Sequence, residues 1–368
     1  MKFDYIIVGA GISGCTIAEQ LSHDKSKQIL IIDKRPHIAG NCYDYRNRNN
    51  IVVQKYGPHI FHTKIERVWN YLSQFTNWEQ YQHHVLAYID GMYVPIPFNL
   101  NSIDMCFPEA LAKDITDKLL AHFPFGSKIP ILQLRQSNDD TLTLLANYIY
   151  EKVFLGYNIK QWGVKPEELS PSVSERLPIH ISRDNKYFQD KYQGIPSEGY
   201  TKMLERMLDS SNIHLLLNTN YFDVKDDLQC EHLYFTGMRD EYFGYEYGKL
   251  PYRSLRFEFE DMELDECYQP SAVVNYPCDY DWTRITEFAH FLPHYKHFST
   301  TIVREYPMPF THTNCEIPYY TIPQPQNEIL ANKYRALKVP NVTFIGRLAD
   351  YKYYDIDTAI DAALQLFQ

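Results

Sequence analysis

Three glycines near the N-terminus have the spacing of a turn that binds a pyrophosphate. Gly9, Gly11 and Gly14 form a G-x-G-x-x-G pattern between the apolar run of residues 5–8 and a helical stretch. In such a turn the first glycine permits a tight bend, the second lets the backbone approach the phosphates, and the third allows the helix to pack closely on the strand. The start of the helix, which includes Ser13, then faces the anion. We therefore predict that this turn binds the pyrophosphate of a dinucleotide.

The segments that follow this turn favour FAD over NAD. Asp33 ends the second apolar run, where a carboxylate can accept hydrogen bonds from ribose hydroxyls. A second turn of small residues follows, and a strand near the C-terminus ends at another glycine, shortly before an acidic helix start. Two separate turns of this kind hold the two ends of FAD in large flavoproteins. The pattern adds these residues to the predicted cofactor site: Lys34, Gly40, Asn41, Gly346, Arg347, Asp355 and Asp357.

Composition and missing motifs exclude several other classes of protein. There is no second G-x-G-x-x-G pattern and no C-x-x-x-x-C pair, which counts against a pyridine-nucleotide disulfide reductase. The seven cysteines have no C-x-x-C spacing, so we expect free thiols in the reducing cytoplasm and no metal site. A net charge of -10 argues against nucleic acid as a partner, and no segment has the length and apolarity expected for membrane insertion.

The elements that must position these residues indicate an α/β protein. Residues 5–32 are typical of a βαβ unit, with two apolar runs around a helical stretch. Residues 102–170 have a helical pattern, whereas short β-like runs recur between residues 215 and 310. At 368 residues the chain exceeds what one hydrophobic core usually serves, so several sub-domains are expected. The last expected elements are a strand at residues 342–345 and a helix at residues 358–367.

A set of motifs along the chain resembles one enzyme family. The motifs are Gly57-Pro58-His59-Ile60-Phe61-His62-Thr63, Gln161-Trp162-Gly163, Arg176-Leu177-Pro178, Tyr187-Phe188, Glu198-Gly199-Tyr200-Thr201, Thr283-Arg284-Ile285-Thr286-Glu287, Pro318-Tyr319-Tyr320, and Gly346-Arg347 followed by Tyr351 to Asp357. They occur in order across essentially the whole chain. With the N-terminal turn, they resemble UDP-galactopyranose mutase of the bacterial flavoenzyme type.

The resemblance implies an isomerase that interconverts UDP-galactopyranose and UDP-galactofuranose without net redox change. In that family N5 of the reduced FAD attacks the sugar C1 as UDP leaves, so the cofactor is the nucleophile and a covalent flavin–sugar adduct forms. The sugar then closes again through a different hydroxyl. The open alternatives are UDP-N-acetylgalactosamine as the substrate, an amine-oxidase-like flavoenzyme on the same fold, and a non-catalytic nucleotide-sugar-binding protein. An oxidase of neutral amines has no use for two phosphate-binding arginines.

The resemblance also assigns residues to the substrate. Arg176 and Arg284 are the expected catalytic arginines, because guanidinium pairs bidentately with phosphate and UDP gains negative charge as it leaves. Tyr157 and Trp162 match the aromatic residues beside the uracil and the sugar. The remaining expected substrate-binding residues are Phe154, Asn158, Tyr187, Asn275, Tyr319, Tyr320 and Tyr353, with the diphosphate contact left open between Tyr319 and Tyr320.

His59 is the third catalytic candidate. The resemblance implies a position beside the flavin, where it sets protonation or geometry, and a purely structural histidine is the alternative. His62 is expected to be a bystander. The resemblance adds the following residues to the cofactor site: Ile60, Phe222, Tyr354 and Ile356.

Several positions depart from the family pattern. Asp33 stands where Glu is more usual, and it should still serve the ribose. Val153 and Asn158 replace Phe and Thr near the uridine, which predicts a looser base pocket. Thr321 replaces the usual Pro, and His83-His84 is an uncommon polar pair in a segment that borders the sugar. These changes leave the reaction type intact and the sugar specificity open.

The expected architecture has three domains that meet at the active site. An FAD-binding Rossmann-like domain is formed by residues 1–78, 195–245 and 316–368. An inserted helical domain spans residues 102–170. An antiparallel β-sheet domain is formed by residues 79–101, 171–194 and 246–315. The resemblance further implies a homodimer.

Overall fold

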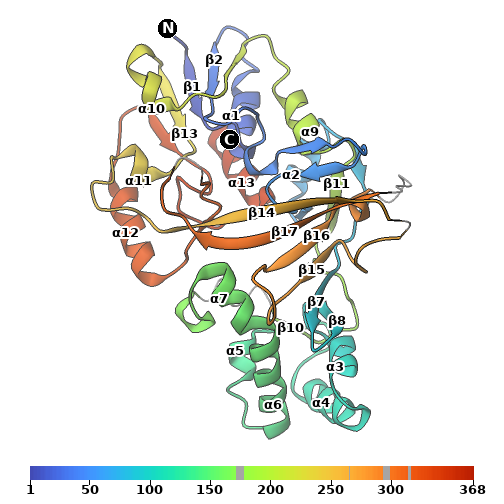
Figure 1. Cartoon of the computed structure of the whole chain (residues 1–368). Coiled ribbons are helices and arrows are strands. Elements are labelled where there is room, and N and C mark those ends of the chain that lie inside the picture. The colour runs from blue at the N-terminus through green and yellow to red at the C-terminus, as the bar shows by residue number, and fades with distance from the viewer. Residues whose placement is uncertain (171–177, 265, 293–298, 314–315) are drawn as a thin grey trace.

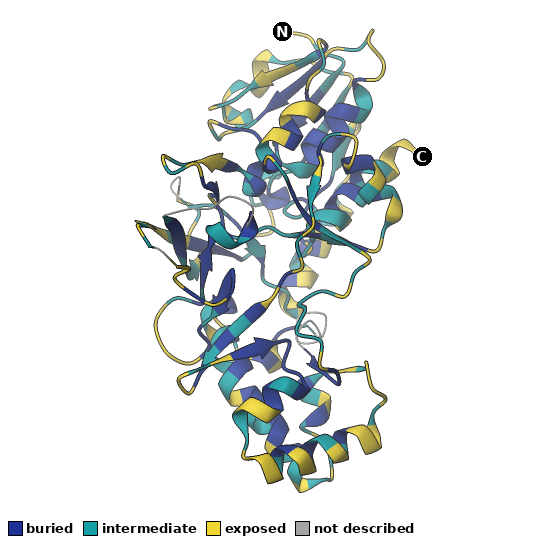
Figure 2. Ribbon diagram, turned by 90° about the vertical axis from the view of Figure 1, so that its right-hand side faces the viewer, coloured by how far each residue is buried: buried dark blue, intermediate teal, exposed yellow. Residues whose placement is uncertain are grey.

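The computed structural model describes residues 1–368 except 171–177, 265, 293–298 and 314–315, and its elements fall into three regions (Figure 1). A parallel sheet with its helices lies at the end that carries the N-terminus, a long mixed sheet crosses the middle, and a group of helices lies at the opposite end. Figure 2 shows buried residues along the sheets and on the inward sides of the helices, and many exposed residues on the outer helices of the far end.

The first region is a five-stranded parallel sheet in the order β12-β2-β1-β13-β19. Its apolar strands are covered by helices on both faces, as is usual for a parallel sheet. Residues of β1, β2 and the three helices α1, α9 and α13 share one core. This arrangement confirms the expected Rossmann-like α/β fold. The elements are β1 (Tyr5–Val8), β2 (Ile29–Ile32), β12 (Ile213–Leu216), β13 (His232–Phe235), β19 (Val342–Phe344), α1 (Ile12–Leu21), α9 (Tyr200–Met207) and α13 (Ile356–Leu364).

The second region is a seven-stranded sheet in the order β18-β14-β17-β16-β15-β7-β8. Its strands are β7 (Val85–Ile89), β8 (Met92–Ile96), β14 (Tyr252–Met262), β15 (Val273–Asn275), β16 (Arg284–Glu287), β17 (Thr300–Pro309) and β18 (Tyr320–Thr321). Neighbouring strands are antiparallel, except that β15 pairs with β7 in parallel. The expectation of an antiparallel sheet misses this pair, because β7 and β15 are joined through the helical region and not by a hairpin.

The third region is a helical unit below the second sheet in Figure 1. Asn99 and Asp139 cap the helices that begin after them, because each side chain accepts hydrogen bonds from backbone amides of the first turn. The last three segments run continuously from Asp140 to Trp162, so the core of the helical unit positions Trp162 at its end. The elements are α3 (Leu100–Cys106), α4 (Glu109–His122), α5 (Ile131–Leu134), α6 (Asp140–Ile149), the π-helical segment η2 (Tyr150–Leu155) and α7 (Gly156–Trp162).

Smaller elements connect these regions. Three short sheets are formed by β3 with β4, by β5, β11 and β6, and by β9 with β10. In the described ranges, none of the helices combines the length and the apolarity needed to cross a bilayer. The exact domain boundaries stay a prediction. The connecting elements are β3 (Asp44–Arg46), β4 (Val52–Gln54), β5 (Phe61–Thr63), β6 (Trp78–Glu79), β9 (Lys128–Ile129), β10 (Ile179–His180), β11 (Tyr192–Pro196), α2 (Glu66–Leu72), α10 (Tyr221–Val224), α11 (Arg239–Tyr242) and α12 (Pro325–Ala336).

Candidate active site

A cavity of about 730 Å³ lies at the carboxyl ends of the parallel strands β1, β2 and β13. This is the edge at which open α/β sheets bind their ligands. Most of the residues predicted to bind the cofactor line it: Gly9, Gly11, Ser13, Gly14, Asp33, Lys34, Gly40, Asn41, His59, Phe222, Gly346, Arg347, Tyr354, Asp355 and Ile356.

Two predicted cofactor residues do not line this cavity. Ile60 packs beside the small core that contains Ile51 and Val53. The Asp357 carboxylate accepts a hydrogen bond from the Thr63 hydroxyl at 2.8 Å. Both residues are adjacent in sequence to cavity residues, but their side chains serve packing and a tertiary contact in the described structure.

The glycine turn has no room for side chains. Gly9 has a φ of +106°, and a Cβ atom there would lie 2.0 Å from Thr236 Oγ1. A Cβ atom on Gly14 would lie 1.9 Å from the carbonyl oxygen of Gly9, because α1 packs against the turn that precedes it. The sequence therefore brings the backbone itself to the wall of the cavity.

Two helix N-termini face this cavity and suit an anionic dinucleotide. Helix α1 begins after Gly11, which offers no side chain to cap it, and its first turn holds no acidic residue. Helix α13 begins after Asp355, whose side chain makes no capping hydrogen bond, but its first turn holds Asp357, which accepts a hydrogen bond from the Thr358 amide. Uncapped amides and the helix dipole favour phosphate oxygens at such positions. The donor set therefore fits the pyrophosphate of the predicted cofactor.

Asp33 is held at the end of β2 by backbone amides. Its Oδ2 atom accepts a hydrogen bond from the Ala10 amide at 2.8 Å, and its Oδ1 atom accepts one from the Arg35 amide at 2.8 Å. Each carboxylate oxygen has a second lone pair, so both can still accept a ribose hydroxyl. The Asp33 carboxylate thus holds the backbone of the turn in place and also provides hydrogen-bond acceptors at the cavity.

Arg347 connects the cavity to a group of aromatic side chains. Its guanidinium donates hydrogen bonds to the carbonyl oxygens of Tyr319, at 3.2 Å, and Tyr354. The guanidinium carbon lies 5.6 Å from the ring centroid of Tyr320 and 5.1 Å from that of Tyr353. Backbone carbonyls thus fix the orientation of Arg347 at the cavity wall.

His59 is held as a neutral imidazole between two arginines. Burial lowers the pKa of His59 to about 4, and the charges of Arg347 and Arg284 act in the same direction. Its Nδ1 atom lies 2.9 Å from the Gly57 carbonyl oxygen, which assigns the ring proton to Nδ1 and leaves Nε2 as an acceptor. The Gln54 side chain clamps the His59 backbone, because its oxygen accepts from the amide and its nitrogen donates to the carbonyl.

Arg284 lies in a row of polar residues that crosses the second sheet. The strand register places Asn275 of β15 beside Arg284 of β16, and Arg284 beside Glu305 of β17. Within the described part of the chain, Asn275 Oδ1 and Glu305 Oε1 are buried without a hydrogen-bond partner. Buried polar groups are normally satisfied, so these atoms are consistent with a polar ligand at this row.

Glu305 is the counter-charge of Arg284. Its Oε2 atom lies 3.1 Å from Arg284 Nε, and the Glu305 side chain is only 1% exposed while that of Arg284 is 21% exposed. Burial is the largest single effect and opposes the charge on Arg284, but the Glu305 carboxylate and the nearby tyrosines together raise the pKa of the guanidinium above its usual value. Arg284 therefore stays positively charged, with one side paired and the other side accessible.

Aromatic side chains from three segments lie near Arg284. Trp162, at the end of α7, contacts Tyr320 and Tyr353 at ring-centroid distances of 5.8 and 6.3 Å. The rings of Tyr320 and Tyr353 are nearly parallel, 5.8 Å apart. Tyr157, Tyr320 and Tyr353 lie close enough to Arg284 to act on its charge. The structure therefore brings three predicted tyrosines close to Arg284, and Trp162 contacts two of them.

Tyr319 points to a different environment from Tyr320. It is buried with Tyr56 and Leu255 in a small core, and its ring contacts Phe257 at 5.7 Å. Of the two candidates for the diphosphate contact, the structure places Tyr320 beside Arg284 and Tyr319 in packing.

The other predicted substrate residues lie on or near the helical unit. Phe154 is buried in its core, and Tyr187 packs against that core. Asn158 is buried and donates a hydrogen bond to the Phe154 carbonyl oxygen at 2.8 Å. Arg176 lies outside the described residues.

Four further positions were missed by sequence reasoning. Glu305 contacts Arg284 on a neighbouring strand, and Gln54 contacts the His59 backbone in the following loop, so no local sequence pattern identifies either residue. Arg253 is buried and donates hydrogen bonds to the carbonyl oxygens of Gln161 and Lys160, which holds the end of α7 that carries Trp162. Thr236 could have been found, because it follows a parallel strand at the edge where ligands bind.

Comparison with known proteins agrees with this geometry. The family model for UDP-galactopyranose mutase matches residues 152–353, and the model for an NAD(P)-binding Rossmann-like domain matches residues 7–75. A Klebsiella pneumoniae protein named "Probable UDP-galactopyranose mutase" is 38% identical over 98% of this chain and 92% of its own length. An Escherichia coli protein named dTDP-fucopyranose mutase is 36% identical over 99% of this chain and 97% of its own length.

A solved structure supports the same fold. The crystal structure of a reduced UDP-galactopyranose mutase superimposes with a TM-score of 0.71, at 14% identity, over 99% of this chain and 95% of that one. The matched family model covers the segments that carry Trp162, Arg284, Tyr320 and Tyr353. The chain therefore belongs to the UDP-galactopyranose mutase family.

Proposed function

We propose that this chain binds FAD and, with the flavin reduced, interconverts UDP-galactopyranose and UDP-galactofuranose. The observation that carries the proposal is the placement of Arg284. It is a partly buried cation paired with Glu305, tyrosine side chains lie close enough to act on its charge, and it acts on the charge of the cavity residue His59. The mutase names of the full-length relatives support a sugar nucleotide as the substrate.

The cavity supports FAD as the cofactor. The amides at the start of α1 and α13 would hold the pyrophosphate, and Asp33 would accept hydrogen bonds from the adenosine ribose. Arg347 and Asp355 would lie beside the ribityl chain and the phosphates. When bound and reduced, the flavin supplies a nucleophile for the anomeric carbon of the sugar.

The residues of the chain itself would stabilise the leaving group and orient the sugar. As the bond between the sugar and the diphosphate breaks, negative charge develops on UDP, and Arg284 opposes that charge from a fixed position. We expect Arg176 to act as the second arginine. The hydroxyls of Tyr320 and Tyr353 suit the phosphate oxygens, and Trp162 offers an aromatic face to the uridine or the sugar.

His59 would act without adding charge near the cofactor. Its low pKa keeps the ring neutral at pH 7, so Nε2 can accept a hydrogen bond at the cavity. A protonated histidine between Arg284 and Arg347 would place three positive charges in one site. The neutral form therefore suits a site that must hold both a reduced cofactor and a diphosphate.

The function is tested by measuring turnover of the FAD-loaded, dithionite-reduced protein with three sugar nucleotides as substrates. UDP-galactopyranose, UDP-N-acetylgalactosamine and dTDP-fucopyranose are incubated separately, and pyranose and furanose products are separated by chromatography. We expect UDP-galactopyranose to be converted fastest. Exclusive conversion of dTDP-fucopyranose would overturn the uridine assignment, and no ring contraction of any sugar nucleotide would overturn the mutase function.

We also infer a homodimer and a cytoplasmic location. The described cysteines are all free, which suits a reducing compartment. Light scattering of the purified protein measures the oligomeric state directly, and a monomer at micromolar concentration would contradict the first inference.

A further inference from the structure

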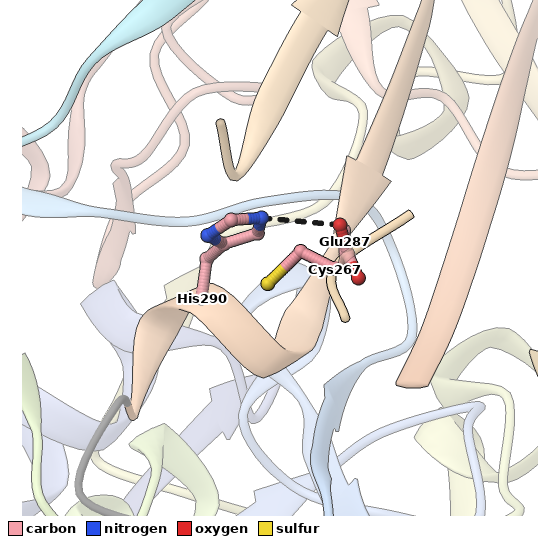
Figure 3. A group of neighbouring side chains, drawn as sticks. All are labelled: Cys267, Glu287 and His290. Carbon is pink, nitrogen blue, oxygen red and sulfur yellow. Dashed lines mark hydrogen bonds and ion pairs between the residues drawn. The ribbon is translucent and has the colours of Figure 1, made fainter. Parts of the chain in front are cut away.

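Three metal-ligating side chains converge on the second sheet, away from the candidate active site (Figure 3). Cys267 lies in the loop before β15, Glu287 ends β16, and His290 lies in the short helix that follows. One donor atom from each lies within 4.8 Å of the other two. Glu287 is three residues from Arg284 on the same strand, so the two side chains point to opposite faces of the sheet.

The Glu287 carboxylate is already fixed in place. It is fully buried, and it accepts hydrogen bonds from the amides of Tyr268 and Gln269 and from the Thr300 hydroxyl. The fourth donor is Nε2 of His290, at 3.1 Å. The backbone bonds explain the carboxylate as an anchor for the loop. His290 Nε2 also lies 3.0 Å from the Gln269 carbonyl oxygen. These bonds do not account for the Cys267 thiol, which lies with its donor atom within 4.8 Å of those of Glu287 and His290.

The fourth hydrogen bond occupies the position that a cation would take. A carboxylate oxygen can keep its amide donor and bind a metal through its second lone pair. The imidazole proton would move from Nε2 to Nδ1, so the ring stays neutral and releases no proton. The Cys267 thiol would lose its proton, so one proton is released for each metal ion bound. Cys267 is exposed, which gives a cation access from solvent.

We propose that Cys267, Glu287 and His290 form a site for Zn²⁺ or a similar borderline-soft divalent cation. Thiolate, imidazole and carboxylate are the ligands of zinc, whereas Mg²⁺ and Ca²⁺ require mainly oxygen ligands. Zinc–ligand distances of about 2.0–2.3 Å require the three donor atoms, now within 4.8 Å of one another, to move closer together, and Cys267 is exposed rather than held in the core. A water molecule completes a tetrahedral site.

The position of the site suggests a structural role. A cation there ties the loop before β15 to the end of β16, and these two strands carry Asn275 and Arg284. Metal binding therefore braces the sheet behind the candidate active site. The sequence pattern predicts no metal site, because Cys267 is distant in sequence from the other two ligands and no short motif reveals them.

The site is tested by zinc calorimetry on the full-length, FAD-loaded protein after chelator treatment and tag removal. The native chain should bind one Zn²⁺, and Cys267→Ser and His290→Gln should each weaken binding by about tenfold or more. Cys278→Ser is the matched control, because Cys278 is also exposed but lies outside the cluster. Its zinc affinity should equal that of the native chain, and Mg²⁺ should not bind.

The exposed Cys267→Ser variant decides the outcome, since it leaves the buried Glu287 network intact. Its flavin spectrum and unfolding midpoint in the absence of zinc should equal those of the native chain. Absence of zinc binding by the native chain would overturn the proposal. Equal zinc affinity of Cys267→Ser and the native chain would overturn it as well.

Discussion

Replacing Glu305 by glutamine tests how the fold holds Arg284 in place. The two charged atoms are 3.1 Å apart, and Glu305 is almost fully buried. At an effective dielectric constant of about 20, their attraction is about 5 kcal/mol, and removing one partner of a buried pair typically costs about 3–5 kcal/mol. The cost arises because Arg284 keeps its charge and loses its counter-charge. We expect Glu305→Gln to lower the free energy of unfolding by about 3 kcal/mol.

UDP should reverse part of this loss. If the accessible side of Arg284 meets the diphosphate, the ligand supplies a new counter-charge to the unpaired guanidinium. UDP should therefore raise the unfolding temperature of Glu305→Gln more than that of the native protein. The assay is urea and thermal unfolding of the FAD-loaded protein, with and without saturating UDP.

A surface pair on the same sheet provides the control. Glu258 forms an exposed ion pair with Arg256 on β14, and such pairs contribute little to stability. Glu258→Gln should therefore be indistinguishable from the native chain with and without UDP. The assigned pairing is refuted if Glu305→Gln is as stable as the native protein, or if UDP stabilises both proteins equally.

Further predictions concern the aromatic face, the arginine, the histidine and the glycine turn. Trp162→Ala should weaken UDP binding measured by calorimetry, and unchanged UDP affinity would contradict its role as an aromatic face. Arg284→Ala should reduce turnover about a hundredfold or more with FAD still bound, and near-normal turnover would contradict its role at the diphosphate. Burial lowers the pKa of His59 to about 4 from a reference value of 6.5, so its contribution to stability is present above pH 6.5 and is lost as the pH falls toward 4. His59→Gln should therefore reduce the loss of folding stability between about pH 7.5 and pH 5, measured as the difference between the urea unfolding midpoints at the two pH values. If the variant and the native protein show the same difference, the lowered pKa of His59 is refuted. Gly9→Ala should lose FAD, because its Cβ atom would lie 2.0 Å from Thr236 Oγ1; a yellow, stoichiometrically loaded variant would contradict this.

The sequence predicts many of the residues that line the cavity, because the signals for them are local. A glycine turn between an apolar strand and a helix fixes its own geometry, so the residue pattern alone places Gly9, Gly11 and Gly14 at the cavity. Asp33 and Gly346 follow parallel strands, and ligands bind at the carboxyl ends of such strands, so the sequence also predicts that both residues lie at the cavity. The same pattern does not place the neighbours of such residues, and the Asp357 carboxylate accepts a hydrogen bond from Thr63 instead of lining the cavity.

The polar row around Arg284 could not be predicted in the same way. Its members lie on β15, β16 and β17, and the register of those strands decides which side chains face each other. A shift of one residue in β17 would replace Glu305 by Arg304 or Tyr306 as the neighbour of Arg284. The choice between Tyr319 and Tyr320 depends on the same alternation of side chains, so only the folded arrangement decides it.

The most direct test of the proposed reaction counts product against reductant. The FAD-loaded protein is reduced with one equivalent of dithionite without oxygen, and an excess of UDP-galactopyranose is added. We predict many molecules of UDP-galactofuranose per equivalent of reductant, because the ring contraction consumes no electrons. One equivalent of reductant consumed for each product molecule, or equal turnover by the oxidised protein, would contradict this prediction.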